Sequence, residues 1–487
     1  MRKGALIFIC AALIVTAVPA LAELETVTVG GSVRIRGNLI HNEYNLPPQL
    51  RHSPFSTLGR PIGGPTHPAI VSIFAWDDDS RDLAFVEQRT RLHVKADFTQ
   101  AVSAFIEFDS YDVWGEDFRS ADYLTGADSR AMTSDDVEVF QAYIEAKNLW
   151  DTNLSMRVGR QELSFGSEWL IGNRDFAFFY SGLSFDALRF TYAGESFTID
   201  AWASKLAENM DDFGQGDIDF YGIYASCNAL ENHTFDLYAL LLDDDTGAGG
   251  WDDSQLYTLG IRAAGRFAGS WDYDAEVAYQ FGDADSVGMF VGDDNADWDN
   301  IGAKLEIGYA ADMAWKPRFF VSMRYYGGED DRDIGFWDWL NPFDKQDASV
   351  SFNRLFSDEI TNGFLDLNND MSNAWWVRLG VMAAPTEKLR GVLAVTYHEA
   401  VEAFDRPVVP IFTFWTDESS DDLGVEVVLF MEYQYSEDLV FDMGWAHLFT
   451  GEGLEDGNFS VMNGLGFNGG TDDDDSDYVY MGAKLFF

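Results

Sequence analysis

The sequence QRTRLHVKADF at residues 88–98 alternates charged and apolar side chains along its whole length. The charged set is Arg89, Arg91, His93, Lys95 and Asp97, and the apolar set is Thr90, Leu92, Val94, Ala96 and Phe98. Because successive side chains of a β-strand point to opposite faces of a sheet, this period of two predicts a strand. The apolar face would meet a second sheet in a soluble sandwich, or lipid in a membrane barrel whose charged face lines water.

The N-terminus predicts export from the cytoplasm. Arg2 and Lys3 precede the apolar run ALIFICAALIVTAV, which is followed by Ala20-Leu21-Ala22 and then Glu23. A basic start, a short apolar stretch and an A-x-A site are typical of a secretory signal peptide, here residues 1–22. Its cleavage would leave Cys227 as the single cysteine, so no intrachain disulfide is expected.

Composition limits the class of protein further. The formal net charge of −50 argues against nucleic acid as a partner. Acidic chains are often disordered, but an aromatic content of 15% and a strong periodicity contradict disorder here. No Pro-rich or Ser-rich linker divides the chain, so residues 23–487 are predicted to form a single domain.

The pattern of the opening stretch recurs along the chain and predicts about eighteen strands. Only the stretch 217–228 is too mixed for its two faces to be told apart. The predicted strands are 27–39, 88–98, 102–112, 138–148, 153–161, 186–193, 196–205, 217–228, 233–242, 254–266, 270–281, 299–310, 315–326, 373–384, 388–399, 423–435, 438–448 and 477–487.

Short and long connections alternate between these strands. Short turns separate the two strands of each pair, as at Thr99-Gln100, Gly194-Glu195 and Ser436-Glu437. The long loops between them cover 40–85, 113–136, 162–184, 206–216, 243–253, 282–298, 327–372, 400–422 and 449–476. This layout predicts an all-β, transmembrane, antiparallel up-and-down barrel with short periplasmic turns and long extracellular loops. Several aromatic residues lie near the short turns on the apolar face of the strands, where a membrane girdle is expected. They are Trp150, Tyr192, Trp271, Trp315 and Tyr433.

The C-terminus predicts where the barrel resides. Its last strand, VYMGAKLFF at 479–487, alternates apolar and polar residues and stops on Phe487. A final strand that ends in Phe resembles the terminal signal that outer-membrane barrels present to their insertion machinery. We therefore expect a bacterial outer-membrane location after signal-peptide cleavage, with lipid, lipopolysaccharide and the insertion machinery as partners.

Residue parity predicts the lining of the barrel. It assigns Thr90, Leu92 and Val94 to lipid and gives the lumen more bases than acids, although the whole chain is strongly acidic. Two interpretations stay open. Interior charges can pair with one another and fix the wall, or fixed bases can replace part of the hydration of a passing anion, to which guanidinium binds through two oxygens at once.

The segment 157–190, RVGRQELSFGSEWLIGNRDFAFFYSGLSFDALRF, resembles the alginate export family of outer-membrane porins. The matching pieces are Gly159-Arg160-Gln161, Glu162-Leu163-Ser164, Gly166, Leu170-Ile171-Gly172 and Ser184-Phe185-Asp186, followed by Arg189. The resemblance implies an eighteen-stranded barrel that passes anionic polyuronate through an Arg-lined constriction, to which it assigns Arg157, Arg160, Arg174 and Arg189. Together with parity, it predicts this substrate pathway: Arg34, Arg36, Arg89, Arg91, Lys95, Arg157, Arg160, Arg174, Arg189, Arg324 and Arg378.

The chain departs from that family pattern at three points. Trp169 and Leu183 occupy positions where family members often carry Arg. Arg160 falls on the lipid parity of its strand, so it would need a bulge or a place at the rim to reach the lumen. These departures concern the solute more than the fold.

Other classes of function are weighed on the same residues. A general or substrate-specific diffusion porin with acidic loops is the main alternative, and a non-conducting receptor or adhesin is a third. An enzyme is not expected, because no His lies in an H-E-x-x-H motif and Gly182-Leu183-Ser184-Phe185-Asp186 lacks the last Gly of a nucleophile elbow. No cofactor and no metal site are predicted, and the sequence leaves periplasmic export partners open. The acidic runs DDDT (243–246), DDNADWDN (293–300), EDDRD (329–333) and TDDDDSD (471–477) are interpreted as solvated loop surface.

Overall fold

The computed structural model describes most of the expected strands and parts of the loops. The described residues are 24–42, 82–99, 101–114, 137–173, 182–208, 217–245, 254–283, 296–328, 348–349, 351–359, 371–403, 405–409, 412–418, 420–455 and 474–487. The predicted signal peptide lies outside them, and its cleavage stays a prediction.

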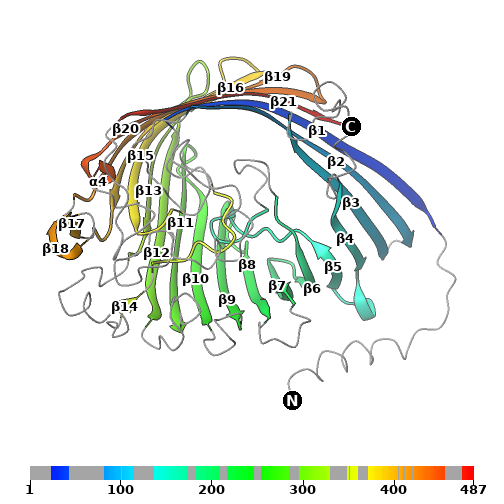
Figure 1. Cartoon of the computed structure of the whole chain (residues 1–487). Helices are drawn as coiled ribbons and strands as arrows, with labels where there is room; N and C mark the ends of the chain where they lie inside the picture. The colour runs from blue at the N-terminus through cyan, green and yellow to red at the C-terminus, as the bar shows by residue number, and fades with distance from the viewer. Residues whose placement is uncertain are drawn as a thin grey trace, which may run out of the picture.

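Eighteen antiparallel strands form one closed barrel, as the alternation predicts (Figure 1). Strands that follow one another pair, and β1 pairs with β21, where Arg34 lies opposite Lys484. A closed sheet satisfies its backbone groups internally, which is the condition for crossing hydrocarbon with strands. The barrel strands are β1 (Thr26–His41), β2 (Leu83–Thr99), β3 (Val102–Val113), β4 (Glu138–Ala146), β5 (Leu154–Gln161), β6 (Phe185–Ala193), β7 (Phe197–Ala207), β8 (Ile218–Cys227), β9 (His233–Asp244), β10 (Ser254–Phe267), β11 (Trp271–Asp283), β12 (Ala296–Ala310), β13 (Arg318–Tyr326), β15 (Ala374–Ala383), β16 (Leu389–Ala400), β19 (Asp422–Gln434), β20 (Leu439–Thr450) and β21 (Ser476–Phe486).

A few short elements accompany the barrel. The two-residue strand β14 (Ala348–Ser349) pairs parallel with β12, and β17 (Asp405–Val409) forms a hairpin with β18 (Phe412–Glu418). The 3-10 turn η4 (Leu149–Asp151) connects β4 to β5, and α4 (Glu452–Glu455) follows β20. Among the described residues, no helix has the length and apolarity needed to cross a membrane.

The strand ends differ from the predicted ones where backbone geometry decides them. The expected strand 315–326 begins only at Arg318, because Trp315 and Lys316 adopt φ values of 70° and 46° and Pro317 cannot donate to a sheet. The expected strand 138–148 ends at Ala146, ahead of the left-handed Asn148. These conformations form the short turns.

Burial separates the two faces of the wall as parity predicts. On β2, Leu92 is 42% exposed on the outside, whereas the inner Arg89 is 2% exposed. The predicted girdle residues near the short turns are all exposed: Trp150, Tyr192, Trp271, Trp315 and Tyr433. Large exposed apolar side chains on one face of a closed sheet are the mark of a lipid-facing surface.

The burial of residues in β8 explains why the sequence of this strand looks mixed. Ile218, Phe220 and Tyr224 are buried on the inner face, and Tyr221 and Ile223 are exposed on the outer face. Both faces of this strand are therefore apolar. The inner face covers part of a hydrophobic core inside the barrel, which a simple lumen–lipid alternation does not anticipate.

Residues on opposite faces of β16 should react differently with a water-soluble maleimide in isolated outer membranes. The side chain of Arg390 is 72% exposed on the inner face, and Leu393 lies on the outer face. We expect Arg390→Cys to be labelled readily and Leu393→Cys to be protected by lipid. Equal labelling, measured by gel shift, would show that 389–400 is not a membrane strand of the predicted orientation.

Candidate functional site

Two loop segments enter the barrel and pair with each other. One comprises residues 162–173, after β5, and the other 351–359, between β13 and β15; the cyan and yellow traces show both inside the ring of strands (Figure 1). The Phe356 amide donates to the Leu170 carbonyl at 2.9 Å, and the Gly172 amide donates to the Phe356 carbonyl at 2.8 Å. The Asp358 amide donates to the Glu168 carbonyl at 2.9 Å. The two segments thus form one constriction held by backbone hydrogen bonds.

Apolar side chains explain why these loop segments fold inward. The buried members of the two segments are Leu163, Phe165, Trp169, Leu170, Ile171, Phe352, Leu355 and Phe356. They pack on aromatic residues of the inner wall: Phe165 stacks on Trp202 with ring centroids 4.7 Å apart, and Phe356 meets Phe220 edge-on at 4.8 Å. Burial of each large apolar side chain stabilises the fold by about 1.5–3 kcal/mol, which holds the segments against the wall.

Trp169 anchors the first segment. Its indole nitrogen donates to the Tyr326 hydroxyl at 2.7 Å, and its ring stacks near Phe352. The side chain is almost fully buried. The second departure from the family pattern, Leu183, packs at the edge of the same core. At both positions, therefore, this chain has an apolar anchor where a base was expected.

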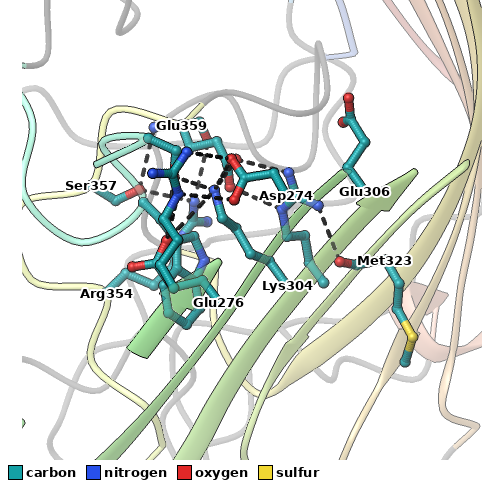
Figure 2. A network of polar contacts seen from close by, with 12 residues as sticks. Asp274, Glu276, Lys304, Glu306, Met323, Arg354, Ser357 and Glu359 are labelled. Carbon is teal, nitrogen blue, oxygen red and sulfur yellow. Dashed lines mark hydrogen bonds and ion pairs between the residues drawn. The ribbon is translucent and has the colours of Figure 1, made fainter. Parts of the chain in front are cut away.

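Figure 2 shows Lys304 beside Glu359 in a network of polar contacts. Lys304 and Arg324 form the polar half of the constriction. They lie directly opposite each other on β12 and β13, and Glu359 of the second loop segment reaches both. Arg324 donates to the two Glu359 oxygens at 2.9 and 2.8 Å, and the Lys304 ammonium donates to one of them at 3.2 Å. Lys304 also donates to the Ser167 hydroxyl, so both inserted segments attach to it.

The charge of Glu359 follows from these contacts. The residue belongs to a loop rather than to a membrane strand. Burial alone would raise the pKa of its carboxyl, but Arg324 and Lys304 outweigh that effect and hold the pKa well below its usual range. Glu359 is therefore a carboxylate at neutral pH, and it neutralises two bases that would otherwise repel each other.

The wall beside this cluster carries further cross-strand ion pairs. Arg262 donates to Asp236 and to Asp274, each at 2.9 Å. Lys304 lies 3.7 Å from Glu276 and 3.5 Å from Asp274. Charges of opposite sign thus alternate along neighbouring strands, which lowers the cost of placing them inside a membrane protein.

The predicted pathway residues on the opposite side of the wall are also paired. Arg36 bridges to Glu87 and Arg89 to Asp109. Arg91 lies 3.6 Å from Glu162 at the start of the first inserted segment. Further pairs are Lys95 with Asp97 at 3.0 Å, Arg157 with Glu145 at 2.9 Å and Arg189 with Asp200 at 2.8 Å. Pairing of interior charges, the first of the two open interpretations, describes this part of the wall.

The remaining predicted pathway residues occupy different positions. Arg34 and Arg378 lie on the inner face, with their guanidinium groups near the rings of Phe486 and Phe320. Arg174 lies outside the described residues. The assignment of Arg160 to the lumen is wrong, because no bulge in β5 turns its side chain inward.

Arg160 keeps the outward parity of Val158, which is exposed on the outer face. Its guanidinium binds Asp186 through two hydrogen bonds of 2.9 and 3.0 Å, and both side chains are about half exposed. Regular strand register, rather than a bulge, thus determines its position.

The periodicity of the sequence does not identify the site residues that lie in loops, because a period of two is informative only within strands. Glu162, Ser167, Arg354 and Glu359 all come from the inserted segments. Aromatic and aliphatic runs such as Trp169-Leu170-Ile171, within otherwise acidic loops, were the signal that could have revealed the insertion.

A cavity of about 730 Å³ lies in the lumen beside the inserted segments. Bases from separate parts of the wall line it, namely Arg36, Lys316, Arg318, Arg390 and Lys484. Carboxylates line it too, namely Glu168, Asp358, Glu359, Glu432 and Asp442. A cavity with both signs of charge can hold a charged solute at several weak contacts.

A closed eighteen-stranded barrel whose loops fold into its lumen is the architecture of an outer-membrane, porin-type channel. The chain belongs to the alginate export family, whose model, described as Alginate export, matches residues 77–468. No curated protein matches the chain.

Solved structures share the fold at low sequence identity. OccK8 (OprE) of Pseudomonas aeruginosa aligns with a TM-score of 0.51 and 11% identity, over 94% of this chain and 98% of that chain. OccK11 (OpdR) of the same organism gives 0.51 and 9%, over 94% and 96%. OccAB4 of Acinetobacter baumannii gives 0.50 and 9%, over 94% and 98%. At such identities the likeness shows the fold alone.

Weakening the inserted core should enlarge the conducting path. Phe356→Ala removes the ring that meets Phe220, and a buried Phe-to-Ala change costs about 3–5 kcal/mol. We expect a higher and noisier single-channel conductance in planar bilayers than for the wild type. Phe319→Ala, on the lipid face, is the control and should leave conductance unchanged. Wild-type conductance of Phe356→Ala would contradict a constriction made by these segments.

Proposed function

We propose that this outer-membrane channel passes an anionic polysaccharide of the polyuronate type, or a related anionic solute, through its Arg- and Lys-lined lumen. The observation that carries the proposal is the lumenal cavity, into which β1, β13, β16 and β21 each bring a base: Arg36, Arg318, Arg390 and Lys484. Membership of the alginate export family supports the same class of solute.

The pairing of these bases suits passage better than tight capture. A polyanion gives up part of its hydration in a narrow lumen, and guanidinium groups can replace it through paired hydrogen bonds. A carboxylate beside each base competes with the solute, so each contact is weak and the solute can leave again. Arg390, whose exposed side chain pairs with Glu432 at the edge of the cavity, is such a contact.

A general or substrate-specific diffusion porin for small solutes is the second candidate. The observation that favours it is the ion pairing deep in the wall, where Arg89, Arg157 and Arg189 are each bound by an acid of a neighbouring strand. In that case the interior charges stabilise the wall, and selectivity depends on the width of the constriction.

Ion selectivity separates the two candidates. The double variant Arg390→Gln/Lys316→Gln removes two exposed bases from the cavity, so its reversal potential in a salt gradient should shift away from anion preference. Arg160→Gln removes the same kind of charge from the outer face and should have no effect. Added polyuronate should block the wild type, and the double variant less strongly.

A cation-selective wild-type channel that polyuronate never blocks would refute the export proposal and favour the general porin. A closed barrel that binds ligand without conducting would instead indicate a receptor.

A further inference from the structure

The position of Glu359 between the cavity and two bases suggests a second role for it. Glu359 lines the 730 Å³ cavity, whereas Arg324 and Lys304 lie behind it and are not among the described lining residues. A solute in the cavity therefore meets the Glu359 side chain before it can reach either base.

The geometry around Glu359 is that of carboxylate recognition. Arg324 donates one hydrogen bond to each carboxylate oxygen, at 2.9 and 2.8 Å, and Lys304 adds a third contact at 3.2 Å. This bidentate arrangement is the strongest that a guanidinium offers to a carboxylate. It recognises the head group alone, so the carboxylate of a free solute would satisfy it equally well.

The two bases need an anion between them. They lie directly opposite each other on neighbouring strands, where like charges destabilise a sheet. Lys304 has further acids nearby in Glu276 and Asp274. Among the described residues, Glu359 is the one carboxylate within salt-bridge distance of Arg324. Whatever displaces Glu359 must therefore bring a negative charge.

The side chain of Glu359 can leave without unfolding its loop. The preceding residues are held by the apolar packing of Phe352, Leu355 and Phe356 and by backbone hydrogen bonds to the first segment. Arg354 donates to the Glu359 backbone carbonyl at 3.3 Å, which fixes the main chain independently of the carboxylate. Displacement of the carboxylate therefore involves rotation about its side-chain bonds, while the main chain stays held in place.

We propose that Lys304 and Arg324 form a carboxylate-binding subsite of the channel, which Glu359 occupies as a tethered competitor of anionic solute. The inference rests on the proposed function for the source of the carboxylate, a uronate unit. A uronate in the cavity displaces Glu359, pairs with both bases and is in turn displaced by Glu359, so capture at this point stays reversible. A tethered group competes at an effective concentration in about the millimolar range or above.

Glucuronate, with glucose as its neutral counterpart, is the probe for this subsite. Concentration-dependent block of current through the purified full-length protein in planar bilayers gives the apparent affinity. Glu359→Gln keeps the shape of the side chain but removes the competing charge, so glucuronate block should tighten by about tenfold or more. Glucose block should stay unchanged.

Two further variants make the test specific. Glu168→Gln removes the same charge from the same cavity, but Glu168 contacts Ser164 rather than either base, so its effect should be small. The double variant Glu359→Gln/Arg324→Gln lacks both the competing carboxylate and the guanidinium that binds it, so the tightened block should be lost.

The outcomes separate the subsite from the proposed function. If glucuronate blocks the wild type, and Glu359→Gln and Glu168→Gln change that block equally or not at all, the subsite is overturned. Tight glucuronate block in Glu359→Gln, without anion selectivity or polyuronate block in the wild type, would support the subsite and refute polyuronate passage.

Discussion

The absence of water in the membrane interior is the constraint on which the rest of this structure depends. Backbone groups that face hydrocarbon must find partners within the chain, and strands achieve this only when the sheet closes on itself. The pairing of β1 with β21 completes that closure. Once the sheet is closed, side chains alternate between lipid and lumen, and most charged residues of the strands fall on the inner face. Arg160 and Asp186, which the same alternation places on the outer face, neutralise each other there.

Inside the barrel, charge has to be balanced locally because the surroundings are only partly aqueous. Isolated buried ions are costly, and a hydrogen-bonded partner of opposite charge offsets part of that cost. Cross-strand pairs such as Arg262 with Asp274 meet this requirement within the wall. Lys304 and Arg324 cannot meet it as a pair, and the loop supplies Glu359. Because the two bases belong to the wall and the acid belongs to the loop, their ion pairs help to hold the inserted loop in its position.

The inserted segments also change what the lumen is made of. An expected water-filled channel contains instead a hydrophobic core beside a cavity, because aromatic residues of the loops pack on those of the wall. Trp169, at a position where family members often carry Arg, contributes to packing rather than to anion binding. Under the proposed function, solute contacts are expected at the cavity, whereas the bases of β2 and β5 pair with acids of neighbouring strands or of the loop.

The sequence by itself determined the barrel: period two and the alternation of short and long connections predicted the number, order and facing of the strands, since the direction of a strand's side chains is a local property. It also placed Arg89 and Arg324 on the inner face. Only the tertiary structure decided which carboxylate meets which base, because pairing depends on register between distant strands. It alone placed Glu359 against Lys304, because loop insertion is driven by packing contacts that are remote in sequence and follow no period.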